Sequence, residues 1–188
     1  MKIAYRRWPA AVLPLLLAAS AGWLRLERPQ QPQQPQQPID STWLTFDRSA
    51  KTVRFQLIAA YTGLNGGLNF NGFRDGDLTV VVPAGWAMRV DFYNHDGVLP
   101  HSAEVIKAEL PVPPGPVNAA IPGAVTLDLG PGIVSEGRDD MRFVAAPAGE
   151  YLLFCAVAGH GLAGMWIRLR ISPDAAAPAL LRTPVKRP

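Results

Sequence analysis

Short apolar runs, separated by glycine- and proline-containing turns, follow one another along the middle of the chain. The run at 51–60 begins with alternating polar and apolar side chains, which is typical of a half-buried strand. The runs at 78–82 and 88–94 flank a turn at 83–86. Further runs predict strands at residues 103–107, 125–129, 141–144, 151–155 and 165–171. Because no long helical period interrupts this series, the pattern predicts an all-β sandwich over residues 39–172.

Two stretches are predicted to lack regular structure. Residues 110–122 are rich in proline and are expected to form a long surface loop between strands. Residues 173–188 are rich in alanine and proline and are predicted to form a disordered tail.

The first 28 residues have the pattern of an export segment. Lys2, Arg6 and Arg7 precede an apolar run at 8–24, which is the order of a signal peptide. Residues 19–21 read Ala-Ser-Ala and favour cleavage, but the run is also at the short limit for a membrane span. Residues 1–28 are therefore interpreted as a signal peptide or a membrane anchor.

A repeat of proline and glutamine follows at 29–38. It has no apolar side chain to bury, and its regular prolines favour polyproline II, so it is predicted to be a semi-rigid linker roughly 30 Å long. A spacer at this place favours a retained anchor. We therefore expect an extracytoplasmic, membrane-anchored protein, in the periplasm or on the outer face of the cytoplasmic membrane.

The positive charge of the chain is concentrated at its ends. The whole chain has a formal charge of +3. From Asp40 onward there are 13 lysine and arginine residues against 14 acidic ones, a balance of −1. Such a domain lacks the basic footprint of a nucleic-acid-binding protein, so no nucleic-acid partner is expected.

The only cysteine of the chain begins a motif with metal-binding chemistry. Cys155, His160 and Met165 are separated by four residues in each gap. A thiolate, an imidazole and a thioether suit a mononuclear copper site, since they accommodate both Cu(I) and Cu(II). Taken singly, a cysteine or methionine of this kind is more often a packed apolar residue. The joint spacing favours the metal site, and coordination also explains an unpaired cysteine in an exported protein.

Such a site needs a second imidazole, and the chain offers His95 and His101. His95 lies in a polar turn beside Asp96 and Gly97 and is expected to face solvent. His101 opens a strand and is predicted to be the ligand. Ser102 is expected to hydrogen-bond to the Cys155 loop and steady it.

Residues 62–172 resemble the cupredoxins, and within them the sulfocyanins. Residues 68–72, Leu-Asn-Phe-Asn-Gly, are similar to the F-N-F-N-G motif of that family, and residues 99–102 and 155–166 also resemble it. Leu68 replaces the first phenylalanine, and Phe73-Arg74 stand where a Thr-Ser pair is common. Rusticyanin has the same Cys-x4-His-x4-Met spacing, whereas plastocyanin has a shorter gap. The resemblance implies a cupredoxin-like Greek-key β-sandwich.

The ligand set and the resemblance together imply a type 1 (blue) copper protein with one copper per chain, bound by His101, Cys155, His160 and Met165. We expect it to shuttle single electrons between respiratory partners: a terminal oxidase, a quinol-oxidising complex or a copper nitrite reductase. The exposed edge of His160 is the expected electron exit, within a docking patch of residues 162–164. The chain is expected to be a monomer.

The alternative is a copper carrier or assembly factor, which would favour exposed methionine and histidine clusters or a C-x-x-C motif. An enzyme is not expected, because three histidines do not suffice for a trinuclear or a second mononuclear copper centre.

Overall fold

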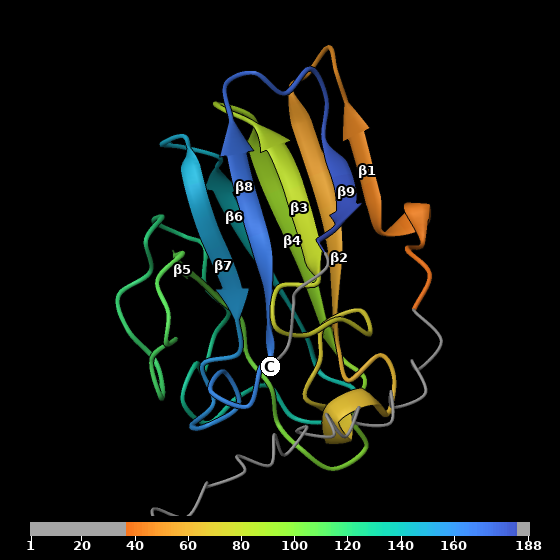
Figure 1. The fold of residues 1–188 in the computed structure, drawn as a ribbon, viewed down its shortest axis with the longest axis vertical. Helices are drawn as coiled ribbons and strands as arrows, with labels where there is room; N and C mark the ends of the chain where they lie inside the picture. Colours follow the sequence, from red (N-terminus) through yellow and green to blue (C-terminus); the bar gives the residue numbers. More distant parts are fainter. Residues whose placement is uncertain (1–36, 184–188) are drawn as a thin grey trace, which may run out of the picture. The chain divides into compact units, whose positions relative to one another are not determined.

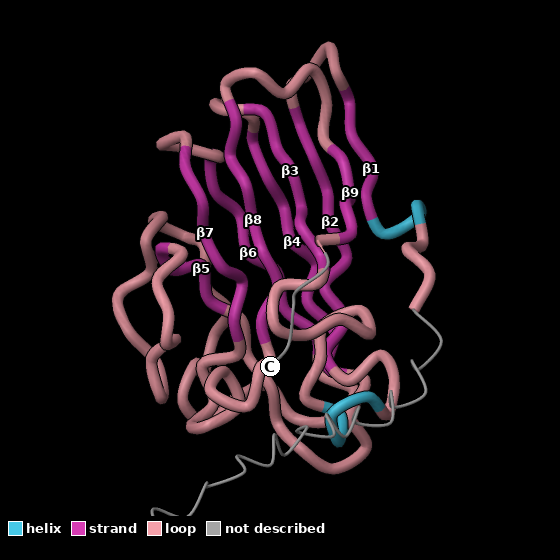
Figure 2. Tube along the Cα trace, viewed as in Figure 1, coloured by secondary structure: helices cyan, strands magenta, loops and turns pink. Residues whose placement is uncertain are grey.

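The computed structural model describes residues 37–183, in which two β-sheets pack face to face (Figure 1; Figure 2). One sheet has the strand order β1-β2-β4-β6 and the other β5-β7-β8-β3-β9. The pairs β2–β4 and β3–β8 are parallel, and the remaining pairs are antiparallel. The strands are β1 (Leu44–Asp47), β2 (Thr52–Ala59), β3 (Leu78–Pro83), β4 (Ala87–Asn94), β5 (Glu104–Lys107), β6 (Arg138–Val144), β7 (Gly149–Phe154), β8 (Trp166–Ser172) and β9 (Ala179–Arg182).

The two helices in this part of the chain are short 3-10 turns, η1 (Ser41–Trp43) and η2 (Leu64–Gly67). Neither helix within residues 37–183 has the length and hydrophobicity needed to span a bilayer. The predictions for residues 1–28 and for the linker as far as residue 36 lie outside the described residues.

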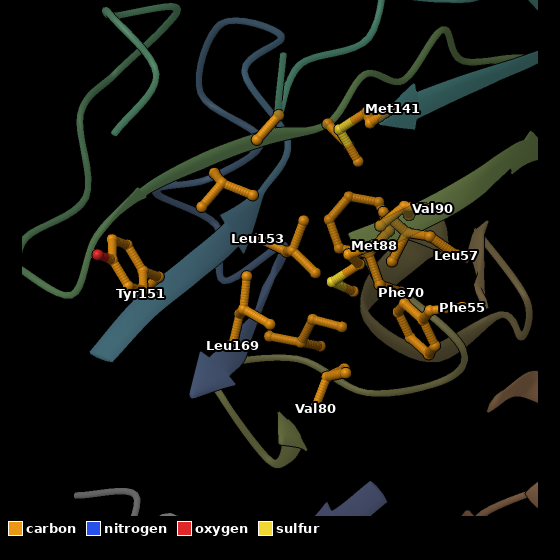
Figure 3. Close-up of a cluster of buried hydrophobic side chains, with 14 of the residues drawn as sticks. Phe55, Leu57, Phe70, Val80, Met88, Val90, Met141, Tyr151, Leu153 and Leu169 are labelled. Carbon is orange, nitrogen blue, oxygen red and sulfur yellow. The ribbon is translucent and has the colours of Figure 1, made fainter. Parts of the chain in front are cut away.

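The core lies between the two sheets because their strands alternate buried and exposed side chains. In β2, Val53, Phe55 and Leu57 are buried while their neighbours Arg54 and Gln56 face solvent. Figure 3 shows the meeting of the two inner faces, with Phe55, Leu57, Met88 and Val90 from one sheet and Val80, Leu153 and Leu169 from the other. The prediction of an all-β sandwich is confirmed.

Seven of the eight predicted strands match β2 to β8 to within a few residues at each end. The prediction of a strand at 125–129 is wrong. Val125 forms only an isolated bridge to Glu104, and Leu127 is 71% exposed, so this run has no neighbour along which to extend. The stretch at 110–122 is a loop, as predicted, and Val112 and Ile121 anchor it by burial.

The prediction of a disordered tail from residue 173, and with it the domain end at 172, is wrong for residues 173–183. Ala179–Arg182 form β9, which pairs antiparallel with β3. All six residues of β3 are buried, so its outer edge needs cover against unwanted pairing. Leu180 packs against the core and helps to supply that cover.

The connections at 60–77, 95–103 and 155–165 meet at one end of the sandwich, the lower end in Figure 1. The N–H of His95 donates to the carbonyl of Ala59 over 3.1 Å, and the N–H of Asp75 donates to the carbonyl of Gly164 over 2.9 Å. Both ends of the described chain flank the 60–77 segment. Gln37 contacts Gly72 and accepts a hydrogen bond from Arg182, while the N–H of Thr183 donates to the carbonyl of Asp77 over 2.8 Å.

Candidate metal centre

The loop between β7 and β8 brings three of the predicted ligand residues together through its backbone. The antiparallel pairing of these strands sets Cys155 opposite Met165, and the Cys155 N–H donates to the Met165 carbonyl over 3.0 Å. The Met165 N–H in turn donates to the His160 carbonyl over 3.1 Å. Spacing of four residues therefore allows one short loop to close on itself.

His101 reaches the same place from the connection between β4 and β5. Its N–H donates to the Ile133 carbonyl over 3.1 Å, and the Ile133 N–H donates back over 2.7 Å. This two-way bridge fixes the backbone of His101 at the end of the sandwich. Because β4 and β5 belong to different sheets, His101 lies on the crossover between them.

The side chains of His101, Cys155 and His160 converge on one point. Their donor atoms all lie within 4.8 Å of one another. The Cys155 Sγ is 3.5 Å from Nδ1 of His160 and 3.9 Å from Nδ1 of His101, so both rings present the same nitrogen. His101 and Cys155 are buried, while His160 keeps a partly exposed edge.

Met165 is buried beside this cluster and is tied to it by the backbone bonds given above. His95 lies apart from it. Its side chain is 54% exposed, and its Nδ1 is 3.9 Å from Glu136, as expected for a turn residue in solvent. Ligation of a metal by His101, Cys155, His160 and Met165 remains a prediction to be tested by metal binding.

The electrostatics of the cluster suit a soft metal ion. Burial raises the pKa of the Cys155 thiol, although hydrogen bonds from Ser102 and Val157 oppose this. Burial lowers the pKa of His101 against the pull of Asp96, and burial followed by the neighbouring His101 lowers that of His160. The lowered pKa of each ring favours its neutral form, which has a lone pair available, and a bound cation would replace the thiol proton. Two imidazoles, one thiolate and a buried thioether fit copper.

Ser102 holds the cysteine as predicted. Its N–H donates to the Cys155 Sγ over 3.4 Å. Its hydroxyl accepts from the Ala156 N–H over 3.2 Å and donates to the Leu129 carbonyl over 2.9 Å. A backbone N–H aimed at the sulfur stabilises a thiolate and restrains its position.

A second support, which the sequence did not indicate, comes from the 60–77 segment. Nη2 of Arg74 donates to the Ala163 carbonyl over 3.3 Å, and Nδ2 of Asn65 donates to the same oxygen over 2.8 Å. Gly164 has a φ of +95°, and a Cβ there would clash with Oδ1 of Asp75. The only feature of the sequence that could have indicated this support was Arg74, which stands where the family commonly has serine.

Two of the three residues of the predicted docking patch lie on the surface, and docking itself stays a prediction. Leu162 is 55% exposed and Ala163 is also exposed. The prediction that Gly164 belongs to the patch is wrong, because Gly164 is buried against Asp75.

Comparisons with known proteins agree with the fold and with the motif. The model of the sulfocyanin (SoxE) domain matches residues 40–181. Sulfocyanin of Sulfolobus acidocaldarius is 31% identical over 141 residues, which cover 71% of this chain and 70% of that protein.

Solved structures with a similar fold include two of rusticyanin variants. One has a TM-score of 0.51 and 24% identity, covering 65% of this chain and 78% of that chain. The other has a TM-score of 0.51 and 21% identity, covering 72% of this chain and 85% of that chain. At these identities the likeness shows that the sandwich is a cupredoxin fold.

Proposed function

Since the chain belongs to the sulfocyanin family, a family of cupredoxins, we propose that it is a mononuclear type 1 copper protein that carries single electrons between redox partners outside the cytoplasm. The observation that supports this most directly is the buried Cys155 Sγ, with Nδ1 atoms of His101 and His160 at 3.9 and 3.5 Å. This donor set with a methionine alongside is that of an electron-transfer site.

Each residue has a role in this proposal. Cys155, His101 and His160 hold the copper, and Met165 is the weak fourth ligand. Copper, when bound, supplies a reversible exchange of one electron between Cu(I) and Cu(II). The hydrogen bonds of Ser102 and of the 155–165 loop keep the donor atoms in place in both states, so little rearrangement accompanies the exchange.

Electrons would enter and leave by the partly exposed edge of His160. Leu162 and Ala163 lie exposed on the same loop, and Val98, 86% exposed, lies on the loop that carries His101. Uncharged side chains at this end suit a small, transient contact with a redox protein. The proposed partners are a terminal oxidase, a quinol-oxidising complex or a copper nitrite reductase, met by a protein held at the outer face of the cytoplasmic membrane.

Burial of the ligands favours an electron carrier over a copper carrier. A protein that hands over its ion must expose the ligands to the recipient, whereas His101 and Cys155 are completely buried. An electron can leave through a ring edge, but a copper ion cannot.

The experiment is a titration of the purified protein with Cu(II), followed by visible absorption and EPR. The wild type is expected to give an intense thiolate-to-copper band and a narrow copper hyperfine splitting. Cys155→Ser and His160→Ala are expected to lose both, while His95→Ala, the matched control outside the cluster, retains them. An ordinary copper spectrum that Cys155→Ser leaves unchanged would refute the proposal.

A further inference from the structure

A carboxylate lies against the back of the His101 ring. Oδ2 of Asp96 is 3.0 Å from Nε2 of His101, the ring nitrogen that faces away from Cys155. The side chain of His101 is 0% exposed and that of Asp96 is 12% exposed. The contact is therefore shielded from water, where an ionised partner has a strong effect on the group it touches.

Asp96 is held in this orientation by its own loop. Its Oδ1 accepts hydrogen bonds from the N–H groups of Val98 and Leu99 over 2.9 and 3.0 Å. Its own N–H donates to Oδ1 of Asn94 over 2.9 Å. With one oxygen occupied by the backbone, only Oδ2 remains for His101.

The packing on the other side of the carboxylate is equally close. A Cβ at Gly67 would lie 2.7 Å from Oδ2 of Asp96, so only a glycine leaves room for the carboxylate there. Asn94 also links the 95–103 loop to the segment before β6. Its Nδ2 donates to the carbonyls of Leu99 and Ile133, each over 2.9 Å. Ile133 is the residue that bridges to the backbone of His101. The same set of hydrogen bonds therefore holds both the carboxylate of Asp96 and the ring of His101 in place.

A carboxylate can only accept a hydrogen bond, so the proton of the neutral His101 ring belongs on Nε2. That leaves the lone pair on Nδ1, which points toward Cys155. We propose that Asp96 is a positioning residue of the copper site, which selects the metal-binding tautomer of His101 and whose negative charge favours Cu(II) over Cu(I). This inference rests on the proposed function for its effect on copper, but the selection of the tautomer concerns the metal-free protein alone.

Asp96→Asn is the sharpest variant, because it keeps the shape of the side chain. The amide oxygen would remain on the N–H groups of Val98 and Leu99, which turns the amide nitrogen toward Nε2 of His101. Two donors would then face each other, so the ring is expected to move its proton to Nδ1. An aspartate-to-asparagine change beside a histidine is known to produce the wrong tautomer in this way.

The first measurement is nitrogen-15 NMR of the histidine rings in the metal-free protein in neutral buffer. The wild type is expected to carry the His101 proton on Nε2, and Asp96→Asn is expected to carry it on Nδ1. Glu136→Gln removes one negative charge at a side chain that is 65% exposed and is the matched control. It is expected to leave the His101 tautomer unchanged.

The second measurement is copper affinity and reduction potential. Asp96→Asn is expected to weaken Cu(II) binding by about tenfold to a hundredfold, the usual effect of removing a group that orients a ligand. Cu(I) binding should fall less, so the reduction potential rises. A tenfold difference between the two states corresponds to about 59 mV for one electron. Glu136→Gln should change the potential far less.

A pair of glycines gives a test that leaves Asp96 itself unaltered. Gly67→Ala places a methyl group against Oδ2, whereas Gly66→Ala has the same left-handed backbone, with φ of +66° against +88°, and no atom within 4 Å. Only Gly67→Ala is expected to shift the reduction potential.

An unchanged His101 tautomer in Asp96→Asn, or a potential that moves no more than in Glu136→Gln, would overturn the inference. A wild type without the type 1 copper spectrum would instead overturn the proposed function, while the tautomer result in the metal-free protein would still stand.

Discussion

Two buried asparagine side chains hydrogen-bond to backbone groups at the end of the sandwich. Nδ2 of Asn69 donates to the carbonyls of Thr62 and Leu64 over 2.7 and 2.8 Å. Oδ1 of Asn71 accepts from the N–H of Ile58 over 3.0 Å, and its Nδ2 donates to the carbonyl of Gln56 over 2.9 Å. The motif at 68–72 therefore shapes the segment that supports the metal loop.

We expect Asn71→Ala to lower the free energy of unfolding by about 1–3 kcal/mol, because the partly buried N–H of Ile58 and the carbonyl of Gln56 lose their partner together. Denaturant unfolding of the metal-free protein measures the loss. Asn118→Ala, the same change at an exposed position, should cost less than about 0.5 kcal/mol. Equal losses in the two variants would contradict this account.

Glu104 is a residue for which burial works against stability. Its side chain is completely buried, Oε2 accepts from the N–H of Val117 over 3.2 Å, and Oε1 has no partner among the described residues. Burial raises the pKa of Glu104 above its ordinary value, and the bond from Val117 opposes this only in part.

Because the folded pKa is the higher one, the contribution of Glu104 to stability is fully present below its ordinary pKa. It is lost as the pH rises through the raised pKa. We expect Glu104→Gln to remove this loss and to stabilise the protein by about 1–2 kcal/mol at neutral pH, with little difference in acid. Unfolding across a pH series tests it against Glu109→Gln, an exposed control. A Glu104→Gln variant that follows the wild-type pH profile would contradict the argument.

At the scale of elements, the strands that the sequence predicts are those with alternating or largely apolar patterns, such as β2 and β3. The edge strands β1 and β9 were missed because none of their residues is fully buried, so their sequences carry little periodic signal. An edge strand is specified mainly by the partner edge it covers. That edge is known only from the fold.

We expect truncation after residue 172 to lower the free energy of unfolding by about 2–4 kcal/mol and to promote self-association. The change removes the β3–β9 ladder, in which each net hydrogen bond contributes about 1 kcal/mol, and exposes the edge of β3. Denaturant unfolding and light scattering measure the two effects. Truncation after residue 183 is the control, and a matching loss there would rule out β9 as the cause.

At the scale of the whole molecule, the metal centre lies where the two sheets are joined. Cys155 and His160 follow β7 of one sheet, while His101 lies on the crossover from β4 of the other. The sequence predicted these three residues from ligand spacing and from the small number of histidines. From the sequence alone, Asp96 is interpreted only as part of a polar turn. Its contact with His101 depends on the folding of the 95–103 loop.

We expect copper to stabilise the whole domain, because it binds the folded arrangement and not the unfolded chain. At a free concentration of a hundred times Kd the gain is about 2.7 kcal/mol, and it appears as a rise in Tm. Thermal unfolding with and without copper measures it. Cys155→Ser should lose most of this rise while retaining the β-sheet circular dichroism of the metal-free protein. An undiminished rise would place the stabilising ion elsewhere.

Gln37 and Thr183, the first and last of the described residues, lie beside the 60–77 segment that supports the metal loop. In a biosensor or on a bioelectrode, the point of attachment would therefore decide which face of the domain meets the support. A domain trimmed to residues 37–183 and attached through either end would approach the support with the face that carries the candidate metal centre. A linker grafted into the 83–86 turn, at the opposite end of the sandwich, would leave that face toward the solution.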